Sequence, residues 1–169
     1  KVLSDPTSNG YSNFTTSVEL IMDNRVGVWT VFDSIFSADT VMEADYFSDK
    51  FRSGNSPLTV TKCSKNITFN NKVAIIKMYP FINFSMVNFT DNIKACLLVG
   101  YHSGTSDENA VDTLLSKCKE KNIPLYLQGL NKESALYDSS NNLQDKGVNL
   151  VYNSTPEYAY ATLMIKVNS

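Results

Sequence analysis

Two short apolar runs constrain the fold of this chain more than any other feature of its sequence. Residues 73–79 (VAIIKMY) and 95–99 (ACLLV) are rich in aliphatic side chains and are bounded by residues typical of turns. Runs of this length and composition are typical of strands that are buried on both faces of a parallel sheet. Residues 84–92, between the two runs, are numerous enough for one crossover helix. The stretch therefore predicts a right-handed βαβ unit.

The rest of the C-terminal half continues this alternation of strands and helices. Ser154 or Thr155 is expected to cap the last helix, with Pro156 at its first position. From residue 73 onward the pattern predicts an α/β domain with a parallel, flavodoxin- or Rossmann-like sheet. The elements expected after the βαβ unit are a helix over 108–121, a strand over 124–128, a helix over 138–146, a strand over 148–151 and a helix ending near residue 167.

The N-terminal part does not read as a complete domain. Asn13 is expected to cap a helix that runs to about residue 23, followed by a strand over 27–32. One helix and one convincing strand cannot bury both faces of that strand. We therefore expect the tail of an incomplete α/β domain over 1–60, a linker over 61–72 and an α/β domain over 73–169. The apolar face of the first helix is predicted to consist of Phe14, Val18, Ile21 and Met22.

Composition excludes several classes of function. The 169 residues carry a formal net charge of −2, so no basic face is available for nucleic acid. No apolar run approaches the roughly 20 residues that a membrane-spanning helix needs. Cys63, Cys96 and Cys118 form no CxxC or zinc spacing, and we expect no metal and no cofactor. Cys96 is interpreted as a small apolar residue of a buried strand, and a Cys63–Cys118 disulfide is left open.

Five Asn-x-Ser/Thr sequences occur in the chain. They fit a secreted eukaryotic protein, although a chain this rich in Asn, Ser and Thr contains some of them by chance. Their acceptor residues are Asn13, Asn66, Asn83, Asn88 and Asn153.

The loop after the second apolar run is the first place to look for a binding site, because ligands of open α/β sheets bind where the strands end. Residues 100–106 (GYHSGTS) form this loop. His102 and Ser103 are adjacent, so their side chains point apart on an extended loop, and we interpret His102 as a polar loop residue rather than a catalytic base. Asp107 and Glu108 follow, and the dipole of a helix beginning there explains them without a metal.

Several short motifs, in their order and spacing, resemble the C-terminal part of the bacterial type I L-asparaginases. Tyr79-Pro80 ends the first strand, and a Tyr-x-x-Gly loop begins at Tyr101 after the second. The resemblance covers nearly the whole chain. Its other motifs are a loop over 3–10, FRSGN over 51–55, Leu127-Gln128, YDSSNNLQDKGV over 137–148 and Thr155-Pro156-Glu157.

The resemblance implies hydrolysis of L-asparagine to L-aspartate and ammonia, without a metal, by a threonine hydroxyl. The family's two threonine motifs precede the part that this chain resembles, so no catalytic residue is expected here. The family's lysine should follow the strand over 27–32, yet no lysine occurs between Arg25 and Lys50. The chain is thus either the C-terminal portion of an amidohydrolase or a catalytically inactive, asparaginase-like pseudoenzyme with a binding or structural role. An isolated α/β domain that binds a small ligand at residues 100–106 is a third hypothesis.

The same resemblance sets the expected partners and site residues. Ser103 and Thr105 are the candidate substrate-binding residues, because the family places an Asn near Thr105 that reaches a neighbouring subunit's site; a purely structural loop role is the favoured alternative. Expected partners are the N-terminal half of the same protein, as a separate or cleaved chain, further copies in a homo-oligomer, and an amino-acid amide if the protein is active. The protein is expected in the cytoplasm if it is like the bacterial enzymes, and it is expected to be secreted if the glycosylation sequences are used.

Overall fold

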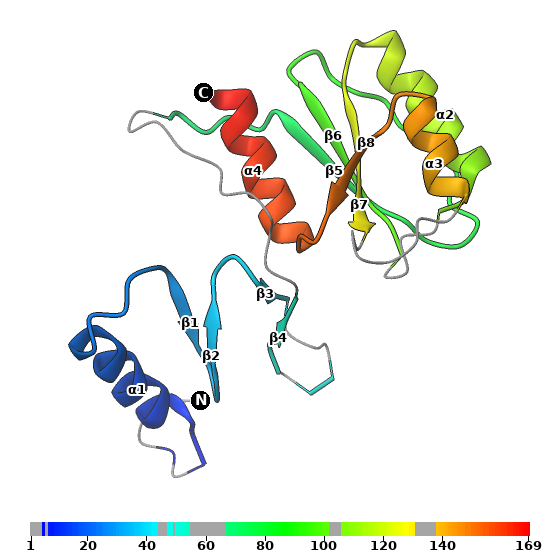
Figure 1. The fold of residues 1–169 in the computed structure, drawn as a ribbon. Coiled ribbons are helices and arrows are strands. Elements are labelled where there is room, and N and C mark those ends of the chain that lie inside the picture. Colours follow the sequence, from blue (N-terminus) through cyan, green and yellow to red (C-terminus); the bar gives the residue numbers. More distant parts are fainter. Residues whose placement is uncertain are drawn as a thin grey trace. The chain divides into compact units, whose positions relative to one another are not determined.

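The computed structural model describes residues 5, 7–43, 47–48, 50–54, 67–101, 106–130 and 138–169, without the side chains of 138–140 (Figure 1). The chain divides into two compact units, Lys1–Gly54 and Asn55–Ser169, and each is described by itself. The predicted linker over 61–72 falls in the second unit, and its first six positions lie outside the described residues.

The second unit is built on one parallel sheet. Its strands are β5 (Val73–Lys77), β6 (Ala95–Val99), β7 (Leu125–Leu130) and β8 (Asn149–Tyr152), which lie side by side in this order. Every neighbouring pair is parallel. The predicted α/β class with a parallel sheet is therefore confirmed.

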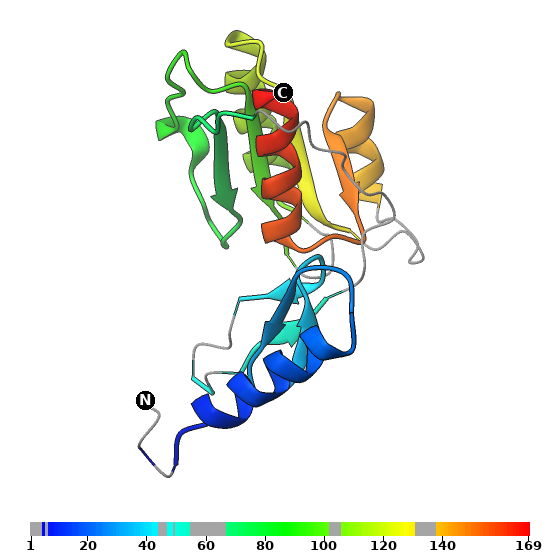
Figure 2. The same ribbon diagram turned by 90° about the vertical axis from the view of Figure 1, so that its left-hand side faces the viewer.

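Helices cover both faces of this sheet. Figures 1 and 2 show α4 (Pro156–Asn168) on one face and α2 (Glu108–Glu120) and α3 (Asp138–Asp145) on the other. β6 is buried on both sides: Cys96 and Leu98 pack in the core beneath α2 and α3, while Leu97 packs in the core beneath α4. This double burial is what the apolar run over 95–99 predicted. The same prediction was wrong for β5, because it is an edge strand of the sheet and Ile75 is 51% exposed.

The connection between β5 and β6 differs from the prediction. No crossover helix forms over 84–92, and the segment contains only a short 3₁₀ helix, η1 (Phe84–Met86). Phe84 and Phe89 insert into the core. Asn83 accepts a hydrogen bond from the Ser85 N–H at 2.9 Å. Asn, Ser and Thr side chains compete in this way for backbone groups, and this competition disfavours a regular helix.

The helix ends of the second unit follow the sequence closely. Asp107 accepts a hydrogen bond from the Ala110 N–H and caps α2. Thr155, rather than Ser154, caps α4 by accepting from the Tyr158 N–H, and proline occupies the first turn as predicted. Among the described residues, no helix is both long enough and apolar enough to cross a bilayer.

The described part of the first unit consists of one helix and two small antiparallel strand pairs. α1 (Gly10–Met22) precedes the antiparallel pair β1 (Trp29–Val31) and β2 (Ile35–Ser37), and β3 (Val41–Met42) pairs with β4 (Arg52–Ser53). The predicted strand over 27–32 is shorter than expected and belongs to a hairpin.

Asn13 is not the cap of α1. The helix begins at Gly10, so Asn13 lies inside its first turns. The Asn13 side chain accepts a hydrogen bond from the Asp33 N–H at 2.9 Å and thereby ties the helix to the turn between β1 and β2.

The predicted apolar face of α1 is not buried. Phe14, Val18, Ile21 and Met22 are all exposed, and Leu20 is the buried apolar residue in the described part of this unit. Beside Leu20 and Ile21, a groove of about 330 Å³ opens between α1 and β1, with Trp29 in its lining. α1 therefore presents exposed apolar side chains beside this groove.

Candidate functional site

The strongest candidate site is the edge where β6, β7 and β8 end. Just beyond β6, the Gly100 N–H donates to the Gln128 carbonyl at 2.8 Å. Just beyond β8, the Asn153 N–H donates to the Leu130 carbonyl at 2.9 Å. These bonds bring the three strand ends together at the edge where ligands of parallel α/β sheets bind.

Gly129 allows the strand ends to approach this closely. Its φ is +120°, and a Cβ at this position would lie 2.8 Å from the Tyr101 carbonyl oxygen. The pairing of β7 with β8 shifts register between Gln128 and Leu130, so Gly129 forms a bulge. Glycine suits this position because it adopts positive φ without strain and has no side chain to collide with Tyr101.

Polar side chains are buried directly around this bulge. Gln128 is buried, and its Nε2 donates to the backbone oxygen of Ser154. Asn153 is also buried and has a φ of +46°, a conformation that Asn tolerates better than most residues. Thr155 is buried as well, and its hydroxyl accepts the hydrogen bond from the Tyr158 N–H that caps α4. Gln128 thus fixes the turn that leads from β8 into α4.

Ser106 adds a buried hydroxyl group that is not satisfied. Within the described residues, its Oγ is the buried side-chain polar atom for which the structure shows no hydrogen-bond partner. A buried hydroxyl without a partner costs about 1–3 kcal/mol. Ser106 lies directly before Asp107, at the end of the predicted binding loop.

Ser103 and Thr105, the predicted substrate-binding residues, lie outside the described residues, and so does His102. Their predicted roles stay predictions. Ser106 belongs to the loop over 100–106 that the sequence singled out, whereas sequence reasoning did not identify the Gly129 bulge or Asn153 as parts of the edge. The run Asn153-Ser154-Thr155, which follows an apolar strand, was the signal available for one of them.

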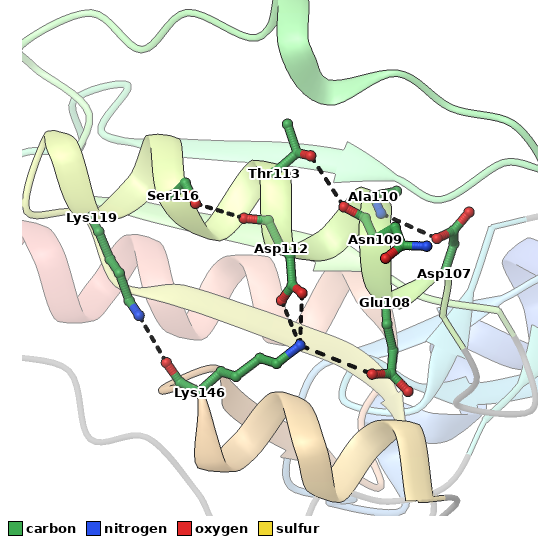
Figure 3. Close-up of polar contacts among 9 residues, drawn as sticks. All are labelled: Asp107, Glu108, Asn109, Ala110, Asp112, Thr113, Ser116, Lys119 and Lys146. Atoms are coloured by element: carbon green, nitrogen blue, oxygen red, sulfur yellow. Dashed lines mark hydrogen bonds and ion pairs between the residues drawn. The ribbon is translucent and has the colours of Figure 1, made fainter.

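An ion-pair cluster holds the start of α2 against α3 (Figure 3). Lys146 Nζ lies 2.9 and 2.7 Å from the two carboxylate oxygens of Asp112 and 4.0 Å from Glu108. Lys119 Nζ donates to the Lys146 carbonyl at 3.0 Å. These side chains are partly exposed, so the stabilisation is about 1 kcal/mol or less. The cluster positions the helix that follows the candidate loop.

The acidic pair at the start of α2 has partners within the fold. Asp107 caps α2, and Glu108 faces Lys146. The described part of the chain contains no group of three or more His, Cys, Asp or Glu side chains that could hold a metal ion. Both carboxylates therefore have structural partners.

The two described cysteines are structural. Cys96 and Cys118 are free thiols, and both are fully buried in one core. Contact with Cys118 and burial raise the pKa of the Cys96 thiol, which keeps it protonated and unreactive. Because Cys118 is a free thiol, the Cys63–Cys118 disulfide is not formed; Cys63 itself lies outside the described residues.

The edge therefore offers neutral hydrogen-bonding groups. Its described side chains include hydroxyls and amides, which suit recognition of a small polar ligand. The hydroxyls of Ser106, Ser154 and Thr155 are not hydrogen-bonded to any described carboxylate or amine that could activate them as nucleophiles.

Comparison with known proteins places the chain among α/β proteins with an asparaginase-like fold. One solved structure that the chain resembles is L-asparaginase I from Vibrio cholerae, with a TM-score of 0.70 and 19% sequence identity. The match covers 99% of this chain and 58% of that chain, so this chain spans less than two thirds of its neighbour. No family model and no curated protein sequence matches the chain. At this level of identity the likeness establishes the fold alone.

Proposed function

We propose that this chain is the C-terminal portion of an asparaginase-like amidohydrolase that converts L-asparagine to L-aspartate and ammonia. A threonine on a segment outside these 169 residues attacks the amide carbon. The observation that carries the proposal is the likeness to L-asparaginase I over 99% of this chain. The sequence motifs, which occur in the family's order, support the same assignment.

The exposed apolar surface of the first unit supports the proposal that a partner segment covers it. Phe14, Ile21 and Met22 project from α1 into solvent, and the groove beside Trp29 is lined largely by apolar residues. An exposed apolar surface of this kind marks an interaction site. In the proposal, the N-terminal half of the same protein covers it, and the completed protein assembles as a homo-oligomer.

The test begins with a denaturing gel and intact-mass measurement on the natural protein, which identify a second polypeptide. Ammonia release from L-asparagine is then measured for the 169-residue chain alone and for the assembled protein. We expect release only from the assembled protein, because the chain alone carries none of the family's threonine motifs. A rate for the assembled protein equal to that of buffer would overturn the enzymatic proposal.

A second candidate function is that of a pseudoenzyme that binds a ligand without turning it over. It is favoured by the lack of a lysine between Arg25 and Lys50, where the resemblance implies one. β3 occupies part of this segment with Val41 and Met42 instead. Calorimetry with L-asparagine separates the two functions: saturable binding without ammonia supports the pseudoenzyme, and ammonia release excludes it.

A further inference from the structure

The connection between β5 and β6 carries two Asn-x-Ser/Thr sequences only five residues apart, at Asn83 and Asn88. Both asparagines are exposed, and so are the hydroxyl residues Ser85 and Thr90. The intervening aromatic side chains point the other way: Phe84 is 2% exposed and Phe89 is 8% exposed. Each buried phenylalanine therefore anchors its sequence in the core and leaves the asparagine and the hydroxyl at the surface.

The local conformation of Asn83 also suits modification. Its φ of −110° and ψ of 106° are extended, and its Oδ1 accepts from the Ser85 N–H at 2.9 Å. This Asx-turn brings the acceptor asparagine next to the residue that carries the hydroxyl. Asn83, whose Nδ2 is the atom to which a glycan is attached, is an exposed residue.

Two other sequences of the same type are already engaged in the fold. Asn13 lies within α1, and its Oδ1 accepts from the Asp33 N–H. Asn153 is 9% exposed, and its hydroxyl partner Thr155 is buried as the cap of α4. The remaining acceptor, Asn66, lies outside the described residues.

The surface next to the two exposed sequences is unusually apolar. Phe81 is 100% exposed and Met86 is 87% exposed, and both lie within three residues of Asn83. Exposed apolar side chains of this size carry an aggregation risk when they cluster. A bulky, solubilising glycan at Asn83 would cover them.

We propose that Asn83 and Asn88 are acceptor sites for N-linked glycans and that Asn13 and Asn153 are not. In the transfer, the side-chain amide nitrogen forms a bond to the anomeric carbon of a lipid-diphosphate-linked oligosaccharide. The bond from that carbon to phosphate oxygen breaks, the lipid diphosphate leaves, and the amide nitrogen loses one proton. No oxidation or reduction occurs.

The direct test uses protein purified from its natural source. Peptide N-glycosidase in heavy-oxygen water converts each glycosylated asparagine to labelled aspartate, which peptide mass spectrometry locates. We expect the label at positions 83 and 88 and unmodified asparagine at 13 and 153. Unlabelled asparagine at both 83 and 88 would overturn the proposal.

A matched variant series tests the distinction between sites in a eukaryotic secretory host. S85A and T90A each remove one sequence while keeping its asparagine, and each should abolish one glycan, seen as one mobility step on a gel. T155V removes the Asn153 sequence and should leave the number of glycans unchanged; N153Q serves as the second control if T155V fails to fold. Loss of a glycan in N153Q, or none in S85A and T90A, would contradict the assignment.

Discussion

The two units of this chain use their apolar residues in opposite ways. In the second unit, β6 is buried on both faces and lies between two cores, beneath α4 on one side and beneath α2 and α3 on the other. In the described part of the first unit, Leu20 is the single buried apolar residue, and the other large apolar side chains of α1 are exposed.

The difference shows where the stability of the chain resides. A parallel sheet covered on both faces satisfies its backbone groups and buries its side chains within one unit. Short hairpins with a single helix expose much of their apolar surface and gain little from burial. We therefore expect the second unit to contribute most of the free energy of unfolding, whereas the first unit depends on what covers it.

The largest predicted effect compares Leu97 with Ile21. L97A removes a fully buried side chain and should lower the free energy of unfolding by about 2–5 kcal/mol. I21A truncates a side chain that is 75% exposed and should change it by less than about 0.5 kcal/mol. Urea denaturation followed by circular dichroism measures both.

The same pair of variants tests whether the surface of α1 is free in the natural protein. If I21A destabilises the assembled protein but not the isolated chain, a partner covers this face. If L97A and I21A lowered the free energy of unfolding of the isolated chain by equally large amounts, the first unit would bury its apolar side chains as the second does, and the contrast between the two units would be wrong.

A smaller effect compares one glycine from each unit. G129A forces a side chain into a φ of +120° and against the Tyr101 backbone oxygen. It should lower the free energy of unfolding by about 2–3 kcal/mol. G27A has a similar φ of +127°, but its Cβ would meet the Trp29 side chain at 3.2 Å, and that side chain can move. G27A should therefore lower the free energy of unfolding by closer to about 1 kcal/mol.

The two glycines are compared by the urea midpoints of the single variants. Crystallography or NMR of G129A should also show a displaced Tyr101 backbone, whereas G27A should show only a shifted indole. A G129A protein as stable as the parent would mean that the strand ends do not approach closely at this edge.

The sequence predicted the second unit well because its signals are local. The aliphatic runs gave β5 and β6, and Thr155 with Pro156 gave the start of α4. The prediction of a crossover helix over 84–92 was wrong because two phenylalanines anchor the segment in the core at a spacing of five, and the side chain of Asn83 just before it accepts a hydrogen bond from the Ser85 N–H. Apolar content alone did not reveal this.

The candidate site was harder to predict because it depends on contacts between distant segments. The need for glycine at 129 arises from Tyr101, which belongs to another strand end. The unsatisfied hydroxyl of Ser106 depends on burial by the finished fold. In the first unit, the periodicity of α1 identified an apolar face but could not tell whether this chain buries it.

The smallest effect compares two exposed carboxylates under acid conditions. A hydrogen bond from Lys121 lowers the pKa of Asp91 in the second unit, and hydrogen bonds from Thr7 lower the pKa of Asp5 in the first. Each carboxylate therefore stabilises the folded state above its unfolded pKa of about 3.9, and this contribution is lost as the pH falls through the lower folded value. D91N should slightly lower the main urea midpoint at pH 6 and leave it unchanged near pH 2. D5N should leave that urea midpoint unchanged at both pH values. If D5N shifted the midpoint as much as D91N does, the two units would unfold together, contrary to the expectation.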